Sequence, residues 1–312
     1  MLDSFGREVH ALRLAVTEAC DLRCRYCMPE SGVQPRGEPL SADELIAIVK
    51  AAAACGINKV RITGGEPLVR PDIVEICTRI SQIPEIRELC ITTNGTKLAD
   101  LAQPLRQAGV SRLNLSLDSL IPERYAQITR GGNLTDVLAG LDAALHADFK
   151  RLKVNCVLMG GVNDDEIAAF VAMTLTMPVD IRFIELMPMG ECAHWPKTAF
   201  ISADEVLKRC PALVPVDREG VAKRYRLPQG IGTVGLISPM SHAFCGDCDR
   251  IRVTADGMLK PCLHSGAELN LRGLGGAALA ERVAEGIGLK PATHRLNESG
   301  TDTDRRMNQI GG

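Results

Sequence analysis

The sequence predicts an α/β fold in which six parallel strands form an incomplete (βα)6 barrel, followed by a smaller second domain. Two features of the 312 residues predict it. Up to about residue 190, short apolar runs alternate with segments of helical spacing, as right-handed βαβ units require. Beyond that point the alternation ends, and proline and glycine become frequent. We therefore expect a barrel over residues 1–195 and a smaller, irregular domain over residues 196–312 that covers the barrel opening.

The candidate strands are the apolar runs at 12–16, 59–63, 89–93, 112–117, 153–158 and 181–185. Alternate residues of a strand share a face, and polar side chains recur at alternate positions here, so each strand presents one polar face. Strands of a helix-covered parallel sheet are normally apolar on both faces. The sequence therefore predicts a barrel interior that holds a polar, anionic ligand, with an exposed sheet face as the alternative. The polar positions are Arg13, Arg61, Thr63, Thr92, Asn94, Asn114, Ser116, Asp118, Lys153 and Asn155.

The segments between these strands carry the start and stop signals of helices. The first, 41–54, opens on Ser41 and Glu44 as a capping box and is followed by Gly56, a suitable residue just past a helix end. The others span 72–80, 97–108, 135–147 and 165–177, and a short helix at 202–209 follows in the second domain. Helices in these positions connect successive strands, which makes the strands parallel.

Composition and charge exclude several classes of function. Lys and Arg total 36 against 38 Asp and Glu, a net charge of −2, so bulk binding to nucleic acid or to an anionic membrane is not expected. Apolar runs long enough to span a membrane are absent, and MLDSFGREVH is unlike a signal peptide. The 12 cysteines are then best read as reduced thiols of a cytoplasmic protein, some of them holding metal.

Cysteine spacing divides these thiols into two triads and six single residues. Cys20, Cys24 and Cys27 follow the first strand as C-x3-C-x2-C, and three ligands with one open position suit a four-iron, four-sulfur (4Fe–4S) cluster. Zinc with a fourth ligand from elsewhere is the alternative. Cys245, Cys248 and Cys262 form C-x2-C-x13-C, which fits zinc as well as iron–sulfur, since His264 lies near in sequence. The others, Cys55, Cys77, Cys90, Cys156, Cys192 and Cys210, are expected to be buried apolar residues.

The first triad, in CDLRCRYC, resembles the radical S-adenosylmethionine (SAM) superfamily, and RITGGEP at residues 61–67 resembles its glycine-rich SAM-binding segment. The whole chain from residue 12 is similar to one family within it, the GTP 3′,8-cyclases of molybdenum-cofactor biosynthesis. The segments that carry the similarity are LRLAVTEACDLRCRYCMP, VRITGGEPLVR, ITTNGT, LNLSLDSL, LKVNCVLMGGVND, IRFIELMP, FCGDCDRIRVTADG, LKPCL and the final Gly311–Gly312.

The resemblance implies a barrel of the radical SAM type with one 4Fe–4S cluster at each end of a shared cavity. The first triad would hold the cluster that binds SAM, and Tyr26, Gly65, Ser116 and Met187 match positions of the SAM site. The second triad would hold a cluster whose open iron binds the guanine of GTP. Positions of the GTP site are matched by Arg13, Arg61, Thr92, Lys153, Arg250, Ile251 and Arg252. Pairing of Arg13 and Lys153 with barrel carboxylates is the alternative to phosphate binding.

The implied activity is that of a lyase. A 5′-deoxyadenosyl radical would abstract the ribose 3′ hydrogen of GTP, C3′ would attack guanine C8, and reduction would give (8S)-3′,8-cyclo-7,8-dihydroguanosine 5′-triphosphate. An external electron donor is implied, and a homodimer is possible. The alternatives are another two-cluster radical SAM enzyme, such as a peptide-modifying one, and a non-catalytic metal-binding module. Residues 297–312 are polar and end in glycine, which predicts a mobile tail; a tail that reaches into the cavity is the alternative.

Overall fold

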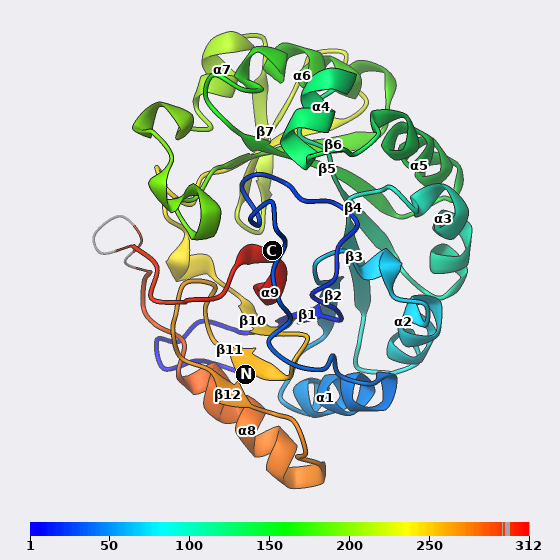
Figure 1. The fold of residues 1–312 in the computed structure, drawn as a ribbon, viewed down its shortest axis with the longest axis vertical. Helices are drawn as coiled ribbons and strands as arrows, with labels where there is room; N and C mark the ends of the chain where they lie inside the picture. Colours follow the sequence, from blue (N-terminus) through cyan, green and yellow to red (C-terminus); the bar gives the residue numbers. More distant parts are fainter. Residues whose placement is uncertain (295, 297–299, 312) are drawn as a thin grey trace.

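The central feature of the computed structural model is one curved sheet (Figure 1). The structure describes residues 1–294, 296 and 300–311. The six predicted strands are present within two residues of their expected bounds and are parallel, which confirms the α/β fold. They are β1 (Ala11–Ala15), β2 (Lys59–Thr63), β3 (Glu88–Thr93), β4 (Arg112–Ser116), β5 (Arg151–Leu158) and β6 (Val179–Glu185).

The helices cover the outer face of this sheet (Figure 1). Between the strands lie α1 (Ala42–Ala54), α2 (Ile73–Ser81), α3 (Leu98–Gln107), α5 (Leu134–His146) and α6 (Ile167–Thr176), close to their predicted bounds, while α7 (Glu205–Arg209) is shorter than predicted. The capping box of α1 is formed as expected, with Ser41 Oγ accepting from Glu44 N at 3.2 Å. A further helix, α4 (Pro122–Thr129), was not predicted. It is a short helix with a polar composition, so its apolar periodicity is weak.

The two faces of the strands differ as the alternation of residue types predicts. Leu12 and Leu14 of β1 are fully buried in the core under the helices, whereas Arg13 between them points to the inner face. In the register of the sheet, Arg13 lies opposite both Arg61 of β2 and Arg252 of β10 (Arg250–Val253). The polar strand faces therefore line the interior of the curve, and the alternative of an exposed sheet face is excluded.

The second half of the chain extends both edges of the same sheet, which the sequence analysis did not predict. Beyond β6 lie β9 (Thr233–Ile237), β8 (Ala222–Arg226) and β7 (Val214–Glu219), and beyond β1 lie β10, β11 (Met258–Lys260) and β12 (Leu269–Asn270). β10, β11 and β12 have four residues or fewer. β7, β8 and β9 have five or six residues, but a proline, a polar run and a glycine interrupt their apolar pattern. Helix α8 (Gly276–Gly288) packs against α1. The domain boundary near residue 195 remains a prediction, since the sheet runs through it.

The prediction of a mobile C-terminal tail is wrong for residues 300–311. This segment enters the curve of the sheet and ends in α9 (Met307–Ile310), near the loop after β1 (Figure 1). Asn308, Gln309 and Ile310 are buried. The prediction failed because it assumed that polar side chains at a chain end face water. Here the side chains of Asn308 and Gln309 donate hydrogen bonds to Glu18 instead. Residues 297–299 and Gly312 of the predicted tail lie outside the described residues.

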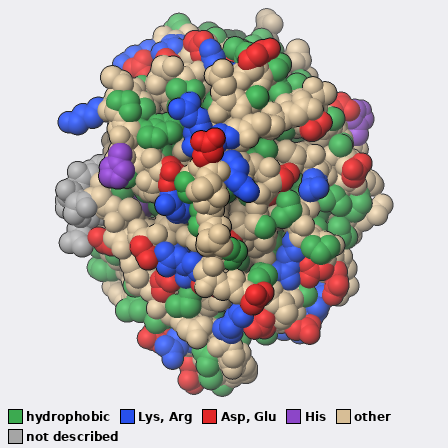
Figure 2. Space-filling model, in the orientation of Figure 1, with side chains coloured by type: hydrophobic (Ala, Val, Ile, Leu, Met, Phe, Trp, Pro, Cys, Tyr) green, Lys and Arg blue, Asp and Glu red, His purple; other side chains and the backbone are tan. Residues whose placement is uncertain are grey.

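The surface carries mixed charge. On the face drawn in Figure 2, Lys and Arg side chains are interspersed with Asp and Glu. This pattern fits a net charge of −2 over the whole chain. Among the described residues, no helix combines the length and the apolar character needed to cross a membrane.

Candidate active site

Both cysteine triads line one cavity of about 350 Å³ inside the curve of the sheet. Its walls are formed by the carboxyl ends of the strands, by the loop after β1 and by the C-terminal segment. Most of the predicted site residues meet there. The lining includes Cys20, Cys24, Cys27, Cys245, Cys248, Cys262, Tyr26, Gly65, Ser116, Met187, Arg13, Thr92, Arg250 and Arg252.

The first triad sits in the loop that follows β1. The thiols are free and partly exposed, and Leu22 N donates to Cys20 Sγ at 3.4 Å. Burial, together with nearby acidic groups and the other thiols, raises the pKa of both Cys20 and Cys27 to about 12. Neutral thiols in such surroundings become good ligands once a cation replaces their protons. The chemistry of the donor set therefore fits a positively charged metal centre.

Tyr26 is fixed beside this triad by a buried carboxylate. Its hydroxyl donates to Asp118 Oδ2 at 2.7 Å, and Val157 N donates to the other carboxylate oxygen at 2.8 Å. Burial raises the pKa of Asp118 to about 6, while these two hydrogen bonds oppose the shift. Asp118 was placed on the polar strand face by the sequence, but its role in holding Tyr26 was missed, because it depends on a contact across 92 positions of the chain.

The structure explains why residue 65 is a glycine, which the sequence alone did not. A Cβ atom at this position would collide with the backbone of Glu18 and Ala19 in the cysteine loop. The two backbones meet through hydrogen bonds from Gly65 N to Thr17 O and from Glu66 N to Ala19 O, both at 2.8 Å. The glycine thus permits close contact between β2's end and the loop that carries the first triad.

The second triad has more electropositive surroundings than the first. Lys290 Nζ lies 3.5 Å from Cys248 Sγ, and His294 N donates to Cys245 Sγ at 3.5 Å. Although burial alone would raise it, the charges of Arg250 and Lys290 lower the pKa of Cys248 to about 7. His264, the alternative zinc ligand, also lines the cavity, with its ring centroid 5.1 Å from that of His294. Within the described part of the chain, no three or more His, Cys, Asp or Glu side chains form a site for a single metal ion.

Four arginines lie close together on neighbouring strands, and among the ion pairs of the described residues only Arg250 has an acidic partner, Asp249 at 3.5 Å. Arg13, Arg61 and Arg252 are neighbours in the register, and Arg250 lies on the same strand face as Arg252. Burial and the charges of the other three hold the pKa of Arg13 well below its usual range. Arg13 Nε is buried without a hydrogen-bond partner. Such a cluster favours a bound anion, because an anion would satisfy this donor and relieve the repulsion.

Two other predicted GTP-site residues are placed differently. Lys153 is buried and its Nζ lies 3.0 Å from Glu219 Oε1, so it has a carboxylate partner, as the alternative interpretation expected. Arg182 contacts the same carboxylate at 2.7 Å. Ile251 is fully buried in the core on the outer face of its strand, since successive strand residues alternate in direction. Only its backbone is available to a ligand.

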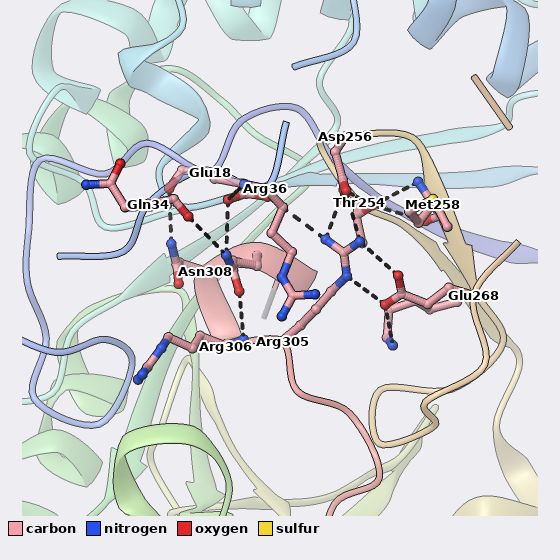
Figure 3. Close-up of polar contacts among 12 residues, drawn as sticks. Glu18, Gln34, Arg36, Thr254, Asp256, Met258, Glu268, Arg305, Arg306 and Asn308 are labelled. Carbon is pink, nitrogen blue, oxygen red and sulfur yellow. Dashed lines mark hydrogen bonds and ion pairs between the residues drawn. The ribbon is translucent and has the colours of Figure 1, made fainter. Parts of the chain in front are cut away.

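The C-terminal segment completes the cavity wall. Gly311 O accepts a 2.7 Å hydrogen bond from Arg252 Nη1, and Met307 and Asn308 line the cavity. Arg305 anchors the segment by forked contacts to two carboxylates, Asp256 and Glu268, at 2.6–2.9 Å (Figure 3). The segment also contacts the loop after β1, where Gln309 Nε2 donates to Glu18 Oε2 at 3.3 Å. No local signal in the sequence indicates these contacts.

A partial α/β barrel whose open cavity holds C-x3-C-x2-C after the first strand defines the radical SAM class of enzymes. A family model described as the radical SAM superfamily matches residues 14–174, and one described as Molybdenum Cofactor Synthesis C matches residues 179–296. Relatives named GTP 3′,8-cyclase match over the full length of both chains. They include those of Alkaliphilus oremlandii, 46% identical over 320 residues, and Pelotomaculum thermopropionicum, 45% identical over 326 residues. The chain therefore belongs to the GTP 3′,8-cyclase family of the radical SAM superfamily.

Solved structures with lower sequence identity share the fold. The structure of Streptococcus suis SuiB bound to S-adenosylmethionine is 14% identical, with a TM-score of 0.62 over 88% of this chain and 63% of that one. The structure of anSMEcpe with bound AdoMet is also 14% identical, with a TM-score of 0.61 over 91% of this chain and 82% of that one. These similarities confirm the radical SAM type of barrel.

Proposed function

We propose that this protein is a GTP 3′,8-cyclase that converts GTP to (8S)-3′,8-cyclo-7,8-dihydroguanosine 5′-triphosphate, the first step of molybdenum-cofactor biosynthesis. The observation that carries the proposal is the cavity itself. Two cysteine triads line it together with Arg13, Arg250 and Arg252, and Arg13 Nε is a buried donor without a hydrogen-bond partner. A peptide substrate would not need this concentration of cations, so the peptide-modifying alternative is not favoured, and neither is a non-catalytic module.

The first triad would hold a 4Fe–4S cluster that binds SAM. Three thiols leave one position of such a cluster open, and the loop after β1 brings all three to the wall of one cavity. Tyr26, Ser116 and Met187 line the cavity around this triad and would contact SAM. Gly65 would contribute its backbone. The hydrogen bond to Asp118 holds the Tyr26 ring in place before any ligand arrives.

The second triad and the arginines would hold GTP. Cys245, Cys248 and Cys262 would ligate the cluster that binds guanine, and Arg13, Arg61, Arg250 and Arg252 would contact the phosphates. Thr92 and the backbone of Ile251 would add neutral contacts, and Lys153 would add a further cation. Arginine suits this role because its planar fork of donors matches phosphate oxygens.

A cluster held by Cys20, Cys24 and Cys27, given SAM and one electron from an external donor, would supply the radical chemistry that removes the ribose 3′ hydrogen of GTP and lets C3′ join guanine C8. The work of this chain is to position the substrate and to exclude water. Arginines on three adjacent strands fix the phosphates, while the C-terminal segment closes the wall at Arg252. Because a displacement of about 1 Å can cost roughly a hundredfold in rate, this rigid placement is what the protein contributes.

We further propose an external one-electron donor, action in the cytoplasm and a homodimer. An electron donor is required because radical generation from SAM consumes an electron that none of the protein's own side chains provides. The cytoplasm is proposed because the free cysteines would be kept reduced there. The homodimer rests on the resemblance to the family.

The test is anaerobic incubation of the reconstituted enzyme with GTP, SAM and a low-potential reductant, with products identified by mass spectrometry. We expect about eight irons per chain and a cyclised GTP product. Arg252→Ala should reduce GTP turnover while leaving SAM cleavage without GTP unchanged, and Arg226→Ala, at an exposed position, should change neither. Intact clusters without any GTP-derived cyclised product would refute the proposal, as would stoichiometric zinc without iron.

A further inference from the structure

The hairpin formed by β7 and β8 brings an acidic side chain, Glu219, close to the amino ends of β4 and β5. Glu219 is the last residue of β7, and Val221 in the turn lines the cavity that holds both triads. In Figure 1 this hairpin reaches from the β7 label into the curve of the sheet. Its tip is therefore part of the wall of the proposed GTP site, although the hairpin lies at the far edge of the sheet from β1.

Glu219 contacts cations from several strands at once. Its Oε1 lies 3.0 Å from Lys153 Nζ, and its Oε2 lies 2.7 Å from Arg182 Nη2. Three further ion pairs join it to Arg151 at 2.6 Å, Arg112 at 3.1 Å and Arg224 at 3.4 Å. The Glu219 side chain is 22% exposed, whereas those of Lys153 and Arg182 are 4% and 9% exposed. The carboxylate is therefore more exposed than the two cations, Lys153 and Arg182, that it contacts most deeply in the barrel.

The cations around Glu219 do not depend on it equally. Arg112 also contacts Glu88 at 2.9 Å, Arg151 also contacts Asp180 at 3.3 Å, and Arg224 also contacts Asp217 at 2.9 Å. Among the ion pairs of the described residues, Glu219 is the carboxylate that Lys153 and Arg182 contact. These two point toward the lumen, where Arg61 adds its charge.

The charges of Lys153 and Arg182 are not balanced by the one carboxylate that contacts both of them, Glu219. Although burial alone would raise it, the charges of Lys153 and Arg182 hold the pKa of Glu219 well below its usual range, so the group is ionised. Even so, Arg182 Nε is buried without a hydrogen-bond partner. Glu219 therefore supplies one negative charge to two buried cations, and one of these cations has a donor to spare. A ligand with several negative charges would satisfy them better than one carboxylate does.

We infer that Glu219 is a resident counter-anion of the triphosphate subsite, and that phosphate binding displaces it from Lys153 and Arg182. The inference rests on the proposed function for the identity of the nucleotide. Before the substrate binds, the carboxylate keeps two buried cations paired and in place. A polyphosphate then competes with an internal carboxylate for the same donors, so Glu219 lowers the affinity for every phosphate ligand. Glu219 lowers the affinity most for ligands with few negative charges, because such ligands compete least well with the carboxylate for Lys153 and Arg182.

The test compares the wild-type holoenzyme with Glu219→Gln, Glu219→Asp and the matched control Glu88→Gln. Glu88 contacts Lys59 and Arg112 near the same end of the barrel but neither Lys153 nor Arg182. Each protein is titrated calorimetrically with inorganic tripolyphosphate, GTP and guanosine. The titrations are run at about pH 6, and each protein is also made with Lys153→Arg, because removal of Glu219 would lower the pKa of Lys153 further below about 7 whereas arginine keeps its charge.

We expect Glu219→Gln to bind tripolyphosphate and GTP about tenfold more tightly than wild type and to bind guanosine unchanged. Glu219→Asp should give a smaller gain, and Glu88→Gln none. Unchanged or weaker tripolyphosphate binding by Glu219→Gln would overturn the inference, and so would an equal change for guanosine. If wild type binds tripolyphosphate but not GTP, the proposed function fails while the inference about Glu219 stands.

A measurement on the wild type covers the case in which the variants do not fold. Hydrogen exchange of residues 217–222 is followed with and without tripolyphosphate. Displacement of Glu219 frees the hairpin tip from its ion pairs, so exchange in this segment should become faster on binding. Slower exchange there would show that Glu219 stays in place and would refute the inference.

Discussion

Replacing Arg305 with alanine should detach the C-terminal segment from the active-site cavity while the barrel stays folded. The Arg305 side chain is 3% exposed and makes two hydrogen bonds to each of Asp256 and Glu268. These carboxylates belong to the turn between β10 and β11 and to the segment before β12. The arginine therefore joins the last residues of the chain to the edge of the sheet.

The size of the effect follows from what the alanine variant leaves behind. With the segment docked, two carboxylates would lose their main cation, and removal of one partner of a buried pair costs about 3–5 kcal/mol. The lower end applies here, because Glu268 keeps Lys260 at 3.0 Å and Asp256 keeps Thr254 at 2.5 Å. With the segment detached, both carboxylates gain water instead. A cost of about 3 kcal/mol then weakens docking by roughly a hundredfold.

Hydrogen exchange of the C-terminal peptide measures this docking equilibrium directly. Gly311 N donates to Met307 O at 3.1 Å, and the exchange of this amide should accelerate by about a hundredfold in Arg305→Ala. Arg306→Ala is the matched control, since Arg306 is adjacent but 36% exposed and pairs with Glu191 at the surface. Its effect should stay below about threefold. If exchange is unchanged in Arg305→Ala, or rises equally throughout the barrel, the segment is not an independent unit and the reasoning fails.

Three further predictions concern the cavity. Gly65→Ala should push back the loop of the first triad, so that reconstituted protein holds about four irons per chain instead of about eight; full iron content would contradict the steric argument. GTP affinity should fall as pH rises above about 7, because burial and Arg182 lower the pKa of Lys153 to about 7 and phosphate binds its charged form. Lys153→Arg should abolish that decrease, and titrations at several pH values would decide it. Cys262→Ala should lose the second cluster and GTP binding but retain SAM cleavage by the first, as iron analysis and product assays would show.

The inner face of the barrel could be predicted from the sequence because its signal is local. Arg13 stands between Leu12 and Leu14, so alternation alone assigns it to the opposite face from the core. The same alternation placed Arg61 and Thr92 on that face. The cysteine triads were predictable for a similar reason, since their spacing is a property of short segments. Their convergence on one cavity came from the family resemblance.

Other parts of the site were not predictable because they depend on contacts between distant residues. Glu219 lies 66 positions from Lys153, at the end of a strand that contains a proline and closes on three charged residues. The C-terminal segment was misinterpreted because polar residues at a chain end usually face water. Here Arg305 meets its carboxylates across 37 and 49 positions, and only the fold shows that they are near.

The arrangement of the sheet has a consequence for the order of folding. During synthesis, β1 to β6 emerge first, and each can pair with a strand that is already present. The outer edge of β1 stays unpaired until β10 is made, and the outer edge of β6 stays unpaired until β9 is made. In the β1–β10 pair, Ala11 lies opposite Arg250. Contacts this distant in the chain form slowly, and unpaired edges attract strands of other molecules. We therefore expect the chain to be most prone to aggregation when β1 to β6 have been synthesised but β9 and β10 have not. Once β9 and β10 are made, they pair with β6 and β1 and cover both edges.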